Sequence, residues 1–316
     1  GRIAYSDWLL RMLPKNSAYA GGGAGFGDAN LVLTHHLDSR NTLQASAYFA
    51  SDRFSFSGDT TFRYKNLNAS ASYRHKGDDD GLFKLSLGYD QYANRLEMHR
   101  WAEGSYDLQT YIRQAFLKAG WTRPAGAHTL SFGLDALGYA LDPGIMDPAG
   151  EASLIRAASL EREYGLEPAL YLSDNWHLTE KFSVDGGVRL SSFLALDPTT
   201  FYAGPEFRLS TKYSPAQTLS FKAGINTMRQ YIHLISNTSS VSPMDSWRLS
   251  SAAIAPTTGW QGAAGAYWTL TGPSVDLSLE GYYKRSRNVL DYKSGALLVM
   301  NPDLAEELVP ALGRAY

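Results

Sequence analysis

The chain has 316 residues, with 29 Lys and Arg against 31 Asp and Glu, and this near balance of charge gives no reason to expect a nucleic-acid partner. It contains no cysteine, which excludes a disulfide scaffold, a thiolate metal site and a cysteine nucleophile. Charged residues make up 19%, below the roughly 25% of an average soluble domain, whereas Tyr (20) and Trp (7) are frequent. Such rings suit a membrane interface, because each combines an apolar ring with a polar tip. The longest apolar runs, such as 296–300, are far shorter than the ~20 residues of a transmembrane helix.

The N-terminal segment starts at Gly1 directly in patterned sequence, without Met or a signal peptide. This is typical of a mature, trimmed or fragmentary chain, and a fragment is the interpretation we favour. The glycines of 21–27 do not fit a Gly-x-Gly-x-x-Gly phosphate loop and precede a strand rather than a helix, so we expect a strand start or an extracellular segment. His35 and His36 are neighbours on that strand and face opposite ways, so they cannot share a metal ion.

Alternation of apolar and polar residues dominates the rest of the chain, and helical periodicity is almost absent. Successive side chains of a strand point to opposite faces of a sheet, so each segment has one apolar and one polar face. The apolar members, which we expect to face lipid, include Leu85, Leu87, Val188, Leu190, Val275, Leu277 and Leu279. The polar members, which we expect to face the lumen, include Ser86, Asp185, Arg189, Asp276, Ser278 and Glu280.

Short and long connections alternate along the chain. Short turns are predicted at 38–41, 76–81, 122–127, 178–181, 214–217 and 271–274. Longer connections are predicted at 53–66, 95–104, 141–160, 195–202, 233–258 and 286–312. A soluble sandwich shares the alternation of side chains but has no reason to place short turns at one end and long loops at the other. The sequence therefore predicts an all-β fold, an antiparallel up-and-down transmembrane β-barrel of about fourteen strands, many longer than the ~5–6 residues of a typical strand.

The sequence contains several groups of residues that resemble catalytic or metal-binding motifs, but their spacing does not fit those functions. The carboxylates of 78–80 lack the alternating ligands of a calcium loop and indicate a solvated turn. No Gly-x-Ser-x-Gly is present, and His128 and Ser131 are three residues apart, on opposite faces of a strand. Glu161, Glu163 and Glu167 are expected on one face of one strand, where a polar lumen wall explains them without catalysis. We expect no catalytic residue, no metal and no cofactor.

The most specific stretch of the sequence is 230–238, Gln-Tyr-Ile-His-Leu-Ile-Ser-Asn-Thr, followed by Pro-Met-Asp-Ser-Trp at 243–247. It resembles the TonB-dependent outer-membrane receptors of the Bacteroidetes type, in which a similar strand end runs into a Pro-x-Asp-x-Trp loop. Further segments that share this likeness are 43–53, 169–174, 254–256, 282–284, 288–296 and 313–316. Such a resemblance implies a 22-stranded barrel of the bacterial outer membrane that is filled by an N-terminal plug. It also implies nutrient import driven by an inner-membrane energy-coupling complex.

This sequence departs from the family pattern, because it shows neither the plug, nor the energy-coupling box, nor the last strands. We therefore interpret residues 1–316 as the middle portion of the barrel domain, incomplete by itself. Its first and last strands, near 4–13 and 274–293, are expected not to pair with each other. The expected partners are outer-membrane lipid, the remainder of the receptor with its plug, the energy-coupling complex, a surface lipoprotein as an open possibility, and no nucleic acid.

Ligand contact is predicted for the long loop 233–258 and its flank, because binding residues concentrate on loops held by a rigid scaffold. The predicted residues are Arg229, Tyr231, Asp245, Trp247 and Arg248, since aromatic and arginine side chains are the usual anchors. A pure packing role for Trp247 is an equal alternative. The ligand class stays open among siderophore, glycan, peptide and vitamin. Two other functions also stay open, a passive or adhesive barrel and an outer-membrane hydrolase.

Overall fold

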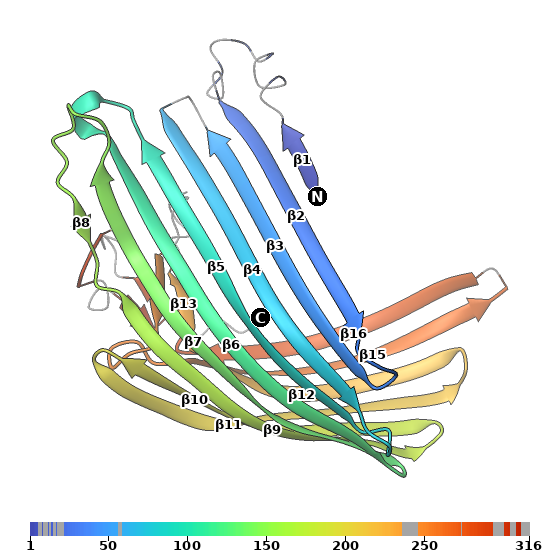
Figure 1. Cartoon of the computed structure of the whole chain (residues 1–316). Coiled ribbons are helices and arrows are strands. Elements are labelled where there is room, and N and C mark those ends of the chain that lie inside the picture. The colour runs from blue at the N-terminus through green and yellow to red at the C-terminus, as the bar shows by residue number, and fades with distance from the viewer. Residues whose placement is uncertain are drawn as a thin grey trace.

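The computed structural model describes residues 1–5, 22–55, 59–235, 246–272, 274–292, 300–303 and 308–310, with the isolated residues 8, 12, 14 and 17. The fold is one large curved sheet of fourteen strands (Figure 1). Its first half consists of β1 (Arg2–Tyr5), β2 (Gly23–His36), β3 (Asn41–Ser55), β4 (Thr60–Lys76), β5 (Leu82–Met98), β6 (Tyr106–Ala125) and β7 (His128–Pro148). The second half consists of β8 (Ala158–Ser159), β9 (Glu163–Thr179), β10 (Phe182–Leu196), β11 (Thr199–Ala216), β12 (Leu219–Gln230), β15 (Thr257–Thr271) and β16 (Ser274–Arg287).

Smaller elements lie outside the large sheet. β13 (Ile232–Ile235) pairs with β14 (Ser246–Leu249), and β17 (Leu290–Tyr292) pairs with β18 (Leu308–Pro310). The short 3-10 helix η1 (Ala102–Gly104) lies between β5 and β6. In the described part of the chain, no helix is long and apolar enough to cross a membrane.

The topology of the large sheet is a simple meander. The strands follow the order β1-β2-β3-β4-β5-β6-β7-β9-β10-β11-β12-β15-β16, each antiparallel to the next, and the short β8 pairs with β7. The strands β2, β4, β6, β9, β11 and β15 therefore run in the same direction. The tight turns that follow the first five of them, at 37–40, 77–81, 126–127, 180–181 and 217–218, all lie at one end of the sheet (Figure 1). The pairing of Thr271 with Ser274 connects β15 to β16 in the same way. The predicted strand number, pairing and common end of the turns are confirmed.

Two of the predicted long connections are wrong. The connection predicted at 53–66 comprises only residues 56–59, because Ser55 already pairs with Thr61. The connection predicted at 195–202 is a two-residue turn, since Leu196 pairs directly with Thr199. In both places charged or turn-forming residues interrupt the alternation of apolar and polar side chains. The strands nevertheless continue beyond the band of exposed apolar side chains on the convex face and keep their hydrogen-bond ladders.

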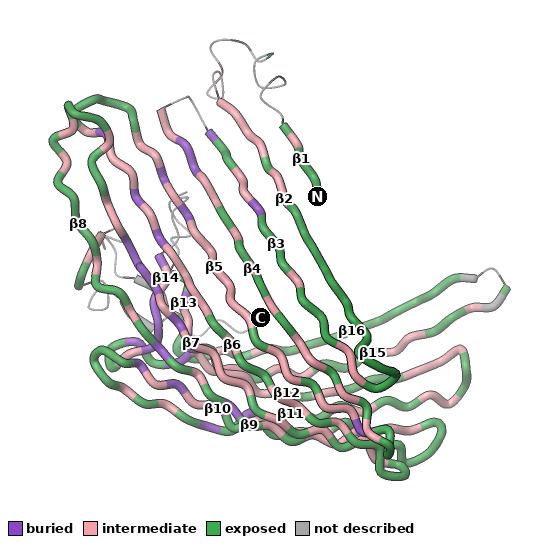
Figure 2. Tube along the Cα trace, viewed as in Figure 1, coloured by how far each residue is buried: buried purple, intermediate pink, exposed green. Residues whose placement is uncertain are grey.

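The two faces of the sheet have the predicted chemistry. The side chains of Leu277 and Leu279 are 50% and 78% exposed on the convex face, as expected of groups that contact lipid and not a closed apolar core. Of the other leucines and valines predicted to face lipid, Leu87, Val188, Leu190 and Val275 are also exposed, and Leu85 is intermediate. Figure 2 shows that most of the buried residues lie towards the end opposite the tight turns and around β13 and β14.

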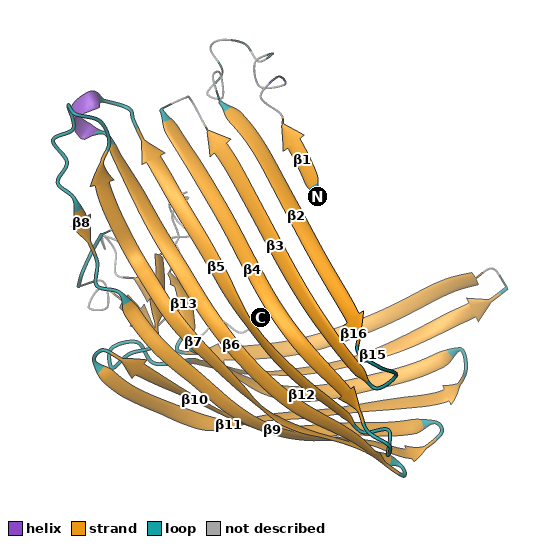
Figure 3. Cartoon of the chain, in the orientation of Figure 1, coloured by secondary structure: helices purple, strands orange, loops and turns teal. Residues whose placement is uncertain are grey.

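The sheet is open among the residues that the structure describes. β1 pairs only with β2 and β16 only with β15, so the two are the edges of the curved sheet (Figure 3). The prediction that the first and last strands do not pair is confirmed for these strands. An unpaired edge in lipid leaves backbone N–H and C=O groups without partners, so the sheet needs further strands to close around a lumen.

Candidate functional site

The long connection between β12 and β15 folds back into the curve of the sheet. Within it, β13 and β14 form a hairpin in which His233 is opposite Arg248 and Leu234 is opposite Trp247. The hairpin lies inside the curve, where β14 contacts β7 and β9 (Figure 1). It therefore lies against the concave inner wall, at the end opposite the tight turns. In an up-and-down barrel of the outer membrane, this end is the extracellular one.

Glu163 attaches this hairpin to the wall. Its side chain, at the start of β9, accepts a hydrogen bond from Arg248 Nη1 at 2.7 Å and another from the backbone N–H of Leu249 at 2.7 Å. A carboxylate that binds both a guanidinium and a backbone amide fixes the orientation as well as the position of β14, because charge-assisted hydrogen bonds are short and directional. The structure thus gives Glu163 a positioning role that the sequence did not reveal.

Aromatic packing attaches the beginning of the same loop. The ring of Tyr231 is stacked on Phe193 of β10, with centroids 5.1 Å apart and an angle of 10° between the planes. Its hydroxyl lies 3.1 Å from Ser191 Oγ, and only 2% of the residue is exposed. Burial raises the pKa of Tyr231. Tyr231 and Leu249 belong to one apolar cluster with Tyr139, Leu141, Phe193 and Ala195, so loop and wall share a core.

His233 is a buried histidine of the hairpin β13–β14. Its Nε2 lies 2.9 Å from Ser250 Oγ and its Nδ1 lies 3.3 Å from Thr257 Oγ1. Burial lowers the pKa of His233 to about 4, because the charged imidazolium would lose its hydration. The ring is therefore neutral at physiological pH and acts here as a hydrogen-bonded structural group.

The five residues predicted to contact ligand lie in different surroundings. Tyr231 and Arg248 are buried and bonded to the wall. Trp247 is partly buried against the apolar cluster, and its indole N–H has no acceptor among the described residues. The guanidinium of Arg229 lies over Gly204 of β11, where a side chain would collide with it. Asp245 lies outside the described residues. The ligand-binding role of all five stays a prediction.

A cleft of about 680 Å³ opens beside the hairpin at the extracellular end. Its walls come from the segment before and at the start of β9, the β10–β11 turn and the residues that follow β14. The polar groups that line it include Arg162, Glu163, Asp197, Arg248 and Ser250. The cleft contains both signs of charge, and its charged groups are largely paired, Arg248 with Glu163 and Arg162 with Asp142.

Deeper on the inner wall, carboxylates gather around one arginine. Asp135 accepts a hydrogen bond from Arg189, and Glu167 accepts one from the hydroxyl of Tyr139 at 2.8 Å. Glu206 lies directly opposite Arg189 in the sheet and is only 6% exposed. Of these, Arg189 was predicted from the sequence to face the lumen and Glu167 to belong to a polar lumen wall. Asp135 and Glu206 became apparent only from the register of neighbouring strands.

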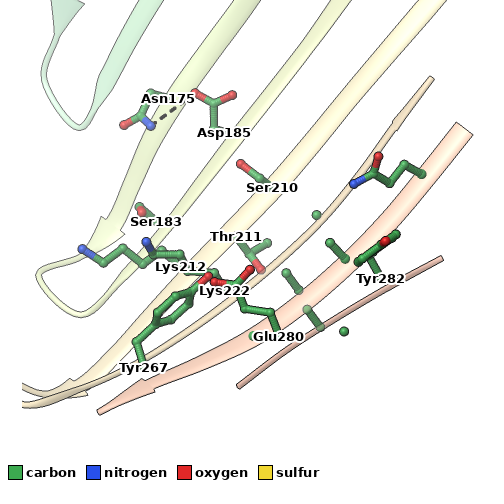
Figure 4. A pocket seen from close by; sticks show the side chains of 17 residues that line it. Asn175, Ser183, Asp185, Ser210, Thr211, Lys212, Lys222, Tyr267, Glu280 and Tyr282 are labelled. Atoms are coloured by element: carbon green, nitrogen blue, oxygen red, sulfur yellow. Dashed lines mark hydrogen bonds between the residues drawn. The ribbon is translucent and has the colours of Figure 1, made fainter. Parts of the chain in front are cut away.

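A second polar hollow, of about 560 Å³, lies nearer the tight turns on the same face. Figure 4 shows the side chains of Asp185, Lys212, Lys222, Tyr267 and Glu280 around it, from β10, β11, β12, β15 and β16. Asn175 Nδ2 donates to Asp185 at 3.4 Å, and Lys222 Nζ lies 4.6 Å from the centroid of the Tyr267 ring. Asp185 and Glu280 are on the lumen side, as the sequence predicted.

Comparison with known proteins decides the family. The family described as "TonB dependent receptor-like, beta-barrel" matches residues 7–302, which is most of the chain. The chain belongs to this family. The matched residues therefore form part of a TonB-dependent receptor β-barrel of the bacterial outer membrane. No curated protein matches it.

Solved structures of TonB-dependent receptors share the fold. The chain superposes on the copper transporter OprC with a TM-score of 0.68 and 11% identity, covering 87% of this chain and 48% of that one. For a mutant of the ferric enterobactin receptor PfeA from Pseudomonas aeruginosa the values are 0.63 and 16%, with 85% and 44% covered. For the ferric citrate transporter FecA they are 0.63 and 12%, with 84% and 44% covered. The chain spans about half the length of these structures.

The other residue groups considered in the sequence, His128 with Ser131, the three glutamates and the carboxylates of 78–80, have structural roles in the sheet and its turns. His128 Nδ1 lies 2.7 Å from Asp174, while Ser131 Oγ lies 2.9 Å from Thr122 Oγ1 on the opposite face. Glu163 and Glu167 share the inner face of β9, but Glu161 precedes that strand, so the prediction that all three lie on one strand is wrong. The carboxylates of 78–80 pair with Arg40, Arg123 and Lys76 around the tight turns. No group of three metal-binding side chains exists among the described residues.

Proposed function

We propose that this chain is the middle portion of an energy-coupled uptake receptor, in which it supplies part of the barrel wall and of the ligand site. The observation that carries the proposal is the hairpin β13–β14, attached by Glu163 to the inner wall beside the extracellular cleft. A loop held in this way presents a preorganised surface at the mouth of the barrel, which lowers the entropic cost of ligand binding.

Within that site we propose ligand contact by Arg229, Tyr231, Asp245, Trp247 and Arg248. Arg229 and Trp247 are partly exposed and can meet a ligand without rearrangement. Tyr231 and Arg248 are buried, so they reach a ligand only when the hairpin moves from the wall. We therefore assign the initial contact with the ligand to Arg229 and Trp247. Tyr231 and Arg248 contact the ligand only after the loop has moved.

The inner wall supports the expected partners. The carboxylates around Arg189 and the hollow near the tight turns give the lumen a polar lining that suits a folded plug. We propose that the plug and, through it, the inner-membrane energy-coupling complex act on this wall. The Bacteroidetes type is a further proposal that rests on the stretch 230–247 of the sequence. A surface lipoprotein above the loops is a separate proposal.

Uptake by cells tests the proposal. A strain that lacks the receptor, complemented with the intact receptor, would be offered a labelled panel of ferric siderophores, copper complexes, glycans, peptides and vitamin B12. Metal compounds belong in the panel because the similar structures are named for copper, ferric enterobactin and ferric citrate. Receptor-dependent uptake that stops when the proton gradient is dissipated is the expected result. Uptake that continues unchanged without the gradient would instead establish the passive barrel.

A further inference from the structure

Three arginines stand side by side across neighbouring strands of the sheet. Arg53 of β3 is opposite Arg63 of β4, and Arg63 is opposite Arg95 of β5. The Cβ atoms of directly opposed residues in antiparallel strands are about 4.5–5.5 Å apart, and like charges at such positions destabilise a sheet. This arginine row therefore needs anions to offset its repulsion.

The arginine row is on the convex face of the sheet. Side chains alternate between faces, and the row shares its face with the exposed Phe49, Leu67 and Leu87. The even-numbered Phe62 and Leu96 of the same strands point the other way and form a buried cluster with Leu108. In a barrel of the outer membrane the convex face contacts lipid, not the plug or the ligand.

The height of the row along the strands is also defined. From the tight turns outward, the convex face of β4 presents Tyr73, Leu67 and Lys65, then Arg63 and last Thr61. Lys65 thus lies between the apolar band and the row. The four cations border the apolar band on its extracellular side, at the depth where the headgroups of the outer leaflet lie.

The carboxylates near the row only partly neutralise it. Glu97 lies 2.6 Å from Arg63 Nε and 3.6 Å from Arg95 Nε, and Asp107 lies 2.7 Å from Arg95 Nη2. Both acids are further from the apolar band than the row itself, since Glu97 is opposite Thr61 and Asp107. Arg53 and Lys65 have no ion-pair partner within the described part of the chain, and the other neighbour of Arg53 is Gly25. The lipid-proximal side of the row keeps a positive surplus.

We propose that Arg53, Arg63, Lys65 and Arg95 bind the phosphate of a phosphorylated lipid in the outer leaflet of the outer membrane. An arginine fork matches two phosphate oxygens, and a lysine supplies a further point charge on a flexible stem. A headgroup that rises from the apolar band meets Lys65 and Arg53 before it meets the two carboxylates, so charge complementarity favours an anionic lipid. This inference is independent of the transported ligand.

Native mass spectrometry of the intact receptor in a non-ionic detergent tests the proposal. The probes are a diphosphorylated glucosamine-disaccharide lipid and the same lipid without phosphates. The test variant is Arg53→Gln/Lys65→Gln. The matched control is Arg74→Gln/Lys84→Gln, which removes two opposed cations from the inner face of β4 and β5. The test variant should bind the phosphorylated lipid about tenfold more weakly or worse, because two charge-assisted contacts are lost.

The control variant should retain wild-type affinity, and the dephosphorylated lipid should bind equally to all three proteins. Inorganic phosphate at the concentration of the lipid should not displace it. Equal binding of the phosphorylated lipid to wild type and test variant overturns the proposal, and so does displacement by inorganic phosphate. If the double variant is not recovered folded, Lys65→Gln alone decides, since a side chain exposed to lipid does not contribute to the buried core.

Discussion

Replacement of Glu163 by Gln should release the hairpin β13–β14 from the inner wall. The substitution keeps the size of the side chain and removes its charge, so Arg248 stays in a site where its side chain is only 10% exposed, now without a carboxylate. Loss of one partner of a fully buried ion pair costs roughly 3–5 kcal/mol. Glu163 is 23% exposed, so water offsets part of this cost, and about 2 kcal/mol is the expected loss.

A loss of about 2 kcal/mol raises the population of the detached hairpin by roughly thirtyfold. Hydrogen exchange of the amides of 246–250, followed by mass spectrometry on the intact receptor, measures that population directly. The matched control is Glu161→Gln, an exposed acid two residues away that precedes β9. Exchange in Glu163→Gln that stays within twofold of wild type would refute the anchoring role. A further variant, Glu163→Gln/Arg248→Met, should recover much of the protection, because no uncompensated charge then remains in the site.

Three other predictions concern the wall and the loop. Gly165→Ala places a Cβ 2.5 Å from Phe193 Cζ, so the ring that supports Tyr231 must shift. We expect the free energy of unfolding, measured with denaturant, to fall by about 1–3 kcal/mol. An unchanged denaturation midpoint would contradict this expectation. His233 has a pKa of about 4 in the folded loop against about 6.5 when unfolded, so its neutral form stabilises the loop above pH 6.5 and this contribution is lost as the pH falls towards 4. Exchange of 246–250 should therefore accelerate between pH 6.5 and 4.5 after correction for intrinsic rates, and the acceleration should disappear in His233→Asn. Leu279→Arg should lower the free energy of unfolding in vesicles by about 2–4 kcal/mol, whereas Ser278→Arg on the opposite face should have little effect; equal losses would argue against the assigned faces.

The architecture could be predicted from the sequence because its signals are local. Alternation fixes which side chains share a face, and turn-forming residues mark the ends of hairpins. Leu277 and Leu279 were placed correctly on these grounds alone. The extents of the strands beyond the apolar band were not predictable in the same way. Arg53 and Arg63 resemble loop residues in the sequence, yet they pair in register, because the ladder depends on backbone groups rather than on hydropathy.

The contacts of the site were less accessible to sequence reasoning. The stretch around Tyr231 and Trp247 was distinctive, but its attachment to the wall depends on Glu163 and Phe193, which lie on other strands and far away in the chain. Such contacts follow from the curvature of the sheet and from the fold of the loop. Periodicity contains no information about either.

The attachment of β14 at the first residue of β9 has a mechanical consequence. Glu163 is the point where the connection 149–162 ends and the wall begins, and it is also the point that holds the loop between β12 and β15. Two loops that are separate in sequence therefore share one hinge. A molecule that pulls on either loop transmits force to the other through a single carboxylate, and both loops respond together at the mouth of the barrel.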